Sequence, residues 1–191
     1  MKYNAHFYMD YNWKDVYVGI LEAEVDGIKY YFVDNEDYFT GFKPYTDDAL
    51  FEIEKYAFFS KACLSALPII GFRPDVIHCH DWQTGLVPVY LHERFQGNEF
   101  FHGIKTVMTI HNLKFQGVWD VKAFKYNTGL PDYMFTPDKL EFHKDANMLK
   151  GGLVYADYIT TVSETYAEEI KYPFYGEQLD GLLRARSASL R

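Results

Sequence analysis

Short apolar runs alternate with longer amphipathic runs from residue 75 onward, and this alternation predicts strands followed by helices. Residues 76–77, 106–110 and 158–162 are rich in β-branched and other apolar side chains, as buried strands are. Helical spacing of apolar residues follows at 84–95 and 146–155, and Ser163 can cap another short helix. Because strand–helix–strand units pair their strands in parallel, we expect an α/β fold: a parallel sheet with helices on both faces.

The first third of the chain has a different pattern. Two segments rich in β-branched and aromatic residues, 16–23 and 28–33, flank Asp26-Gly27. This pair is typical of tight turns with positive φ, so an N-terminal β-hairpin is expected. Residues 1–15 are aromatic and polar without a clear period. We therefore expect an irregular lead-in there.

A long helix should follow a loop at residues 34–45. The aspartate pair at 47–48 can cap this helix, whose apolar positions keep helical spacing to about residue 67. Pro68 and the glycine that follows shortly after it should end the helix. A second long loop is expected from residue 111 to about residue 145.

Composition and charge limit the classes of function. A chain of 191 residues with 48% hydrophobic and 24% charged residues suits one globular domain. Its net charge of −8, without a lysine or arginine run, argues against nucleic-acid or anionic-membrane binding. Cys63 and Cys79 lack framework spacing, and the chain shows neither a signal peptide nor a membrane-spanning run. A cytoplasmic protein is expected.

Candidate chemistry gathers where two predicted strands end. His78-Cys-His-Asp81 follows the first apolar run, and His111-Asn112 follows the next. In open parallel sheets, ligands bind beyond the carboxyl ends of the strands. We therefore expect one shared site, with His80 and Asp81 nearer the strand tip and His78 as a core histidine bonded to backbone groups.

Other interpretations of these residues remain open. Two histidines and an aspartate are ligand types that zinc or manganese accepts, so a metallohydrolase is one alternative, although no second acidic cluster completes a ligand set. Asn112 could merely cap the following loop. Gly151-Gly152 inside a predicted helix indicates close approach of the backbone, either to another element or to a ligand phosphate.

Four motifs together resemble a known family. They are His78-Cys-His-Asp-Trp within residues 74–86, Thr109-Ile-His-Asn-Leu within 105–117, and the segments 149–170 and 175–186. In order and spacing they are similar to the bacterial glycogen synthases and plant starch synthases, which use nucleotide-activated glucose. Weaker similarity covers residues 31–60.

This resemblance implies a GT-B glycosyltransferase with two Rossmann-like halves facing across a cleft. Residues 1–191 then form a single incomplete Rossmann-like domain on the acceptor side. The family's first strand, its Lys-x-Gly-Gly loop and its nucleotide-binding C-terminal domain have no counterpart in this sequence. Close helix packing becomes the better explanation of Gly151-Gly152.

The resemblance also assigns roles. His111 matches a histidine that lies against the donor glucose, and Asp81 matches an acid that binds glucose or acceptor hydroxyls. Further substrate-binding positions are expected at Tyr45, His80, Gln83 and Asn112.

The expected reaction is retaining transfer of glucose from ADP-glucose to the non-reducing end of an α-1,4-glucan such as glycogen, without a metal or cofactor. The isolated chain is predicted to be inactive and to be capable of self-association. A maltooligosaccharide-binding module without catalysis is the non-enzymatic alternative.

Overall fold

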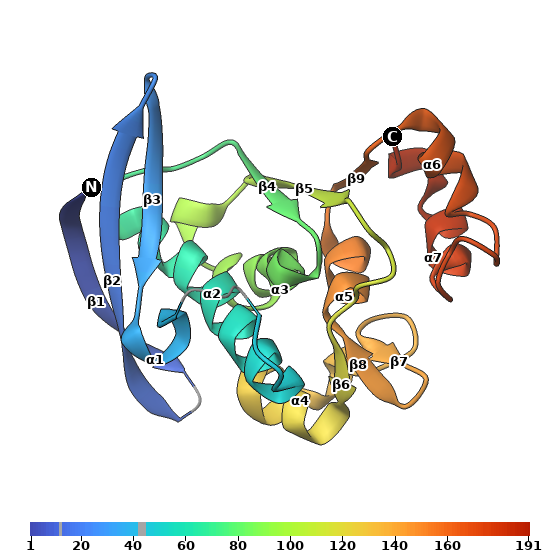
Figure 1. Cartoon of the computed structure of the whole chain (residues 1–191), viewed down its shortest axis with the longest axis horizontal. Coiled ribbons are helices and arrows are strands. Elements are labelled where there is room, and N and C mark those ends of the chain that lie inside the picture. The colour runs from blue at the N-terminus through green and yellow to red at the C-terminus, as the bar shows by residue number, and fades with distance from the viewer. Residues whose placement is uncertain (12, 42–44) are drawn as a thin grey trace.

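A parallel three-stranded sheet lies at the centre of the computed structural model, which describes residues 1–11, 13–41 and 45–191 (Figure 1). It consists of β4 (Val76–His80), β5 (Lys105–Ile110) and β9 (Tyr158–Thr161) in the order β4-β5-β9. Both pairings are parallel, and His80 lies opposite Thr109. The predicted strands and their parallel pairing are confirmed.

Helices cover one face of this sheet. The predicted helix at 84–95 is a 3₁₀ turn (Trp82–Thr84), α3 (Leu86–Tyr90) and a π turn (Leu91–Phe95) in succession. Together with α5 (Met148–Tyr155), α3 lies against the face whose residues Cys79, Met108 and Ile159 are buried. The opposite face is more exposed, with Tyr158 54% accessible, although Thr109 on that face is buried. Of the helices predicted on both faces, α3 and α5 are found on the one face that contains Cys79.

The N-terminal strands form a separate antiparallel sheet. The hairpin is confirmed as β2 (Lys14–Val25) and β3 (Ile28–Asp34), joined at Asp26 and Gly27 with φ of 53° and 78°. The irregular lead-in was a wrong prediction, because β1 (Lys2–Tyr11) pairs along β2. Aromatic residues lie on both faces of β1, so its sequence does not show the simple alternation of apolar and polar residues that indicates a strand. Pairing with β2 stabilises the strand instead.

The long helix α2 (Ala49–Ile69) lies between this N-terminal sheet and α3. Its predicted cap is confirmed: Asp48 Oδ1 accepts a hydrogen bond from the Phe51 amide at 3.1 Å. Pro68 lies in its last turn. The expected loop before it contains α1 (Glu36–Phe39), and residues 42–44 of that loop lie outside the described residues.

The expected loop at 111–145 is partly wrong, because it contains short regular elements. Three short strands, β6 (Val118–Asp120), β7 (Glu141–Phe142) and β8 (Asp145–Asn147), form a small antiparallel sheet in the order β6-β8-β7. The same segment contains the helix α4 (Val121–Thr128) and a 3₁₀ turn at Asp132–Met134. These strands of two or three residues depend on partners distant in sequence, so local periodicity does not reveal them.

The C-terminal part continues the predicted pattern. Ser163 caps α6 (Glu164–Glu169), which is followed by α7 (Asp180–Ala185). Two more 3₁₀ turns cover Glu99–Phe101 and Ser187–Ser189.

The paired glycines of α5 mark a close helix contact. A Cβ on Gly152 would lie 3.0 Å from Gly85 Cα, and one on Gly151 would lie 3.1 Å from Val89 Cγ2. The prediction of close helix packing is therefore confirmed. This packing fixes α5 against the turn that follows Asp81.

Candidate active site

The turn after β4 is held in an unusual backbone conformation. Asp81 has φ 56° and ψ −174°, a region that residues other than glycine rarely occupy. Thr84 holds the turn, since its hydroxyl accepts from the His80 amide at 2.7 Å and lies 2.8 Å from the His80 carbonyl oxygen. The Asp81 amide donates to the Thr109 carbonyl on β5 at 3.0 Å. Backbone strain of this kind clusters at functional sites.

Asp81 joins the ends of the two strands. Its Oδ1 accepts a hydrogen bond from the His111 amide at 2.8 Å. His80 Nδ1 lies 3.1 Å from His111 Nε2, so one of the two rings donates to the other. Burial, with the rings of His78 and His111 close by, lowers the pKa of His80. Burial therefore favours the neutral form of the His80 ring.

His78 is an exception to the sequence-based interpretation. It lies on the exposed face of the sheet, and its Nε2 is 2.6 Å from Thr109 Oγ1. The expectation of a core histidine bonded to backbone groups is therefore wrong. The reason is that His78 points to the face opposite buried Cys79, away from α3 and α5.

Four of the expected site residues line one pocket of about 390 Å³ beside these strand ends. Its walls are formed by Tyr45, Asp81, Trp82, Gln83, Asn112 and Phe115. Gln83 Nε2 donates to the Tyr45 hydroxyl at 2.5 Å across this pocket. The expected histidines, His80 and His111, lie next to the pocket and are joined to it through Asp81.

Asn112 caps the loop after β5 and also lines this pocket. Its Oδ1 accepts from the Lys114 amide at 3.1 Å, which stabilises the loop. Phe115, 59% exposed, was missed from the sequence, although its place four residues after His111 was the available signal. The aromatic walls and scattered polar groups suit a sugar ring.

A second pocket of about 520 Å³ adjoins the first and shares Tyr45, Trp82 and Phe115 with it. The described residues that line it include three acidic residues and one lysine: Asp47, Glu52, Glu177 and Lys114. None of these charged residues was identified as a site residue from the sequence. They reach the pocket from segments far apart in the chain, and no motif connects them.

Metal ligation and membrane crossing find no support in the part of the chain that the structure describes. No three His, Cys, Asp or Glu side chains there are arranged to hold a metal ion. Likewise, no described helix combines the length and apolar character needed to cross a bilayer.

Known proteins resemble this chain over nearly its whole length. The family model of the starch synthase catalytic domain matches residues 1–185. A glycogen synthase of Lachnospira eligens is 66% identical over 190 residues, which are 98% of this chain and 39% of that protein. A glycogen synthase of Lachnoclostridium phytofermentans is 65% identical and covers 100% of this chain and 40% of its own length. The chain thus spans about two fifths of the relatives it matches.

A solved structure shares the fold. The catalytic domain of starch synthase IV from Arabidopsis thaliana, bound to ADP and acarbose, superposes with a TM-score of 0.86 at 24% identity. All of this chain and 40% of that chain are aligned. The fold expected from the resemblance is confirmed. With the match to 185 consecutive residues, these similarities show that the chain belongs to the glycogen and starch synthase family of glycosyltransferases.

Proposed function

We propose that this chain forms the acceptor side of a retaining glucan synthase, which moves glucose from ADP-glucose to the non-reducing end of an α-1,4-glucan. The observation that carries the proposal is the hydrogen bond from the His111 amide to Asp81 Oδ1, beside an aromatic pocket. The names of the relatives, and the ADP and acarbose bound to the Arabidopsis enzyme, support it.

Each polar residue has a role in this scheme. His111 lies beside the donor glucose, and Asp81 both positions its backbone and accepts hydrogen bonds from sugar hydroxyls. His80 orients the ring of His111. Tyr45, Gln83 and Asn112 bind the glucan. An oxocarbenium-like transition state is stabilised by oriented hydrogen bonds and by neutralisation of the leaving diphosphate, so the scheme requires neither a metal nor a cofactor.

The charges of the two pockets favour binding of the glucan in this domain and of the nucleotide in another. The described residues that line the pocket beside Asp81 include one carboxylate and no lysine or arginine. The described residues that line the adjoining pocket include three acidic residues and one lysine. Neither pocket is suited to a diphosphate, whereas a neutral glucan fits both. We therefore propose that residues 1–191 are one Rossmann-like acceptor-side domain and that a second domain of the full-length protein holds the nucleotide.

Titration with maltoheptaose tests the acceptor role. Binding should be weak and measurable by isothermal titration calorimetry, and Asp81→Ala should weaken it about tenfold or more through loss of a charged acceptor. Asp132→Ala is the matched control, because Asp132 pairs with Lys125 on the surface, away from both pockets. Equal affinity in Asp81→Ala and wild type would contradict the proposal.

Two further measurements test the remaining parts of the scheme. The 191-residue chain should not release ADP from ADP-glucose, and turnover would overturn the proposed dependence on a second domain. Binding without transfer is also the behaviour of a maltooligosaccharide-binding module. Transfer by the full-length protein, and its loss in His111→Ala, would distinguish the synthase from such a module.

We also propose that the isolated chain self-associates. The strand order places β4 at an edge of the described sheet, and unpaired strand edges recruit further strands. Light scattering should show a mass that rises with protein concentration, and a constant mass of 22.4 kDa would contradict this.

A further inference from the structure

We infer that the buried ion pair of Glu52 and Lys55 is a positioning device for the glucan site. By holding Thr46 it orients the neighbouring Tyr45 at the junction of the two pockets, and it thereby sets the affinity for a glucan chain. This inference rests on the proposed function and adds a residue pair that lies outside the strand-end motifs.

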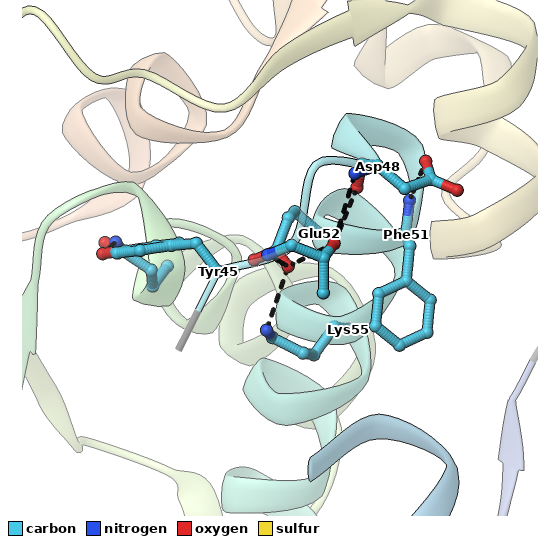
Figure 2. A network of polar contacts seen from close by, with 7 residues as sticks. Tyr45, Asp48, Phe51, Glu52 and Lys55 are labelled. Carbon is cyan, nitrogen blue, oxygen red and sulfur yellow. Dashed lines mark hydrogen bonds and ion pairs between the residues drawn. The ribbon is translucent and has the colours of Figure 1, made fainter. Parts of the chain in front are cut away.

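The contacts converge on one carboxylate oxygen. Glu52 Oε1 accepts from the Thr46 amide at 2.8 Å, from the Thr46 hydroxyl at 3.0 Å and from Lys55 Nζ at 3.1 Å. Glu52 and Lys55 are each only 5% exposed, whereas Thr46 lies on the surface. Figure 2 shows Lys55 reaching Glu52 from the next turn of α2. A buried carboxylate thus anchors an exposed segment from beneath.

The other oxygen of this carboxylate supports a specific role. Glu52 Oε2 is buried without a hydrogen-bond partner among the described residues. Burying a polar atom in this way costs stability, and a buried ion pair is often no more stable than apolar side chains of the same size. Stability alone is therefore a poor explanation for the pair, and fixing the position of residues 45–46 is a better one.

Tyr45 needs such an anchor. Its side chain is 51% exposed and lines both pockets, so packing does little to fix its direction. Its hydroxyl accepts from Gln83 Nε2, which gives it a polar contact at the ring's far end. In Figure 2 the ring of Tyr45 extends away from Glu52. Thr46 fixes the backbone at one end of Tyr45, and Gln83 fixes the hydroxyl at the other.

The same pair supports the wall of the pocket through aromatic rings. Lys55 Nζ lies 4.8 Å from the centre of the Tyr56 ring, and Tyr56 packs edge-on against Trp82 at 5.0 Å. Burial, with Glu52 and Tyr45 nearby, raises the pKa of Tyr56 to about 12, so its hydroxyl stays protonated. The ion pair therefore supports the glucan site through Thr46 and Tyr45 on one side and through Tyr56 and Trp82 on the other.

Amide hydrogen exchange tests the anchor without any ligand. Glu52→Gln keeps the shape of the side chain and removes its charge, so the Thr46 amide should exchange about tenfold faster, as expected for a weakened charged hydrogen bond. Glu54→Gln is the matched control, because Glu54 is on the same helix and accepts instead from the Tyr38 hydroxyl. Unchanged exchange of the Thr46 amide in Glu52→Gln would overturn the inference.

Maltoheptaose affinity tests the consequence for binding. Glu52→Gln should weaken binding several-fold in the wild-type background and should have no further effect in a Tyr45→Ala background. A merely structural role of Glu52 would weaken binding equally in both backgrounds, and that result would overturn the inference.

The failure of this inference can be told from failure of the proposed function. If the wild-type chain does not bind maltoheptaose, the acceptor role and the effect of the pair on affinity are both refuted. The exchange rate of the Thr46 amide still decides whether Glu52 anchors the segment.

Discussion

Replacing Gly85 with alanine should destabilise the fold where it supports the candidate site. Gly85 has φ −59° and ψ −26°, a conformation that alanine adopts without strain. The added Cβ, however, would lie 2.3 Å from the Met148 carbonyl oxygen and 2.7 Å from the Met148 carbonyl carbon. These are backbone atoms of α5, so relief requires a shift of the whole helix. The effect of the substitution is therefore steric.

The magnitude follows from two opposing contributions. Overpacking against backbone should cost about 3 kcal/mol, at the upper end of the usual range. Alanine lowers the conformational entropy of the unfolded chain, which offsets about 1 kcal/mol of this because the backbone of Gly85 suits alanine. A net loss of about 2 kcal/mol corresponds to a fall in Tm of about 4–8 °C for a chain of this length.

Thermal and urea denaturation, followed by far-UV circular dichroism, measures this loss. Gly181→Ala is the control, because the nearest atom that its Cβ would meet is Arg184 Nη2 at 3.8 Å. In α7 the same change should be neutral or stabilising by up to about 1 kcal/mol. A Gly85→Ala protein as stable as wild type would refute the steric explanation of the contact between Gly85 and α5.

Three further predictions follow from buried or paired titratable groups. Burial raises the pKa of Asp157, but hydrogen bonds from Lys105 and Thr106 outweigh it, and the pKa is lowered overall. Asp157→Asn should lower the free energy of unfolding by about 1 kcal/mol at pH 7, and urea denaturation should show this difference shrinking as pH falls below 3.8, where wild type loses the contribution. The pKa of His80 is lowered in the folded chain, so as pH falls below 6.5 this imidazole is protonated more readily in the unfolded chain. The free energy of unfolding should therefore decrease with falling pH. His80→Gln should remove this part of the pH dependence, whereas an imidazole pKa above 6.5 by NMR would contradict it. Burial raises the pKa of Cys79 to about 12, so its thiol should resist Ellman's reagent at pH 8 in Cys63→Ser protein and react once urea unfolds the chain. Rapid labelling of the native protein would contradict that expectation.

Local features of the sequence were enough to predict the framework of the fold. Several elements depend only on residues next to them in the sequence. They are the apolar runs of β4, β5 and β9, the Asp26-Gly27 turn and the cap at Asp48. Periodicity and turn chemistry therefore indicate them directly. The polar ends of parallel strands must share one edge of the sheet, which is why Asp81 and His111 could be placed together before the structure was known.

Features that depend on partners distant in sequence become visible only in the folded chain. β1 exists because it pairs with β2, and the short strands of the β6-β8-β7 sheet hold one another across a segment that reads as a loop. His78 is exposed because it lies on the face of the sheet opposite Cys79, away from α3 and α5. Nothing in the sequence of α2 distinguishes Glu52 from other helical residues. Folding brings its carboxylate beneath Thr46 and beside Lys55. Local signals specify which strands form and where their polar ends meet. The side chains around those polar ends come from segments that are distant in the sequence and have no common motif, so only the folded chain shows them together.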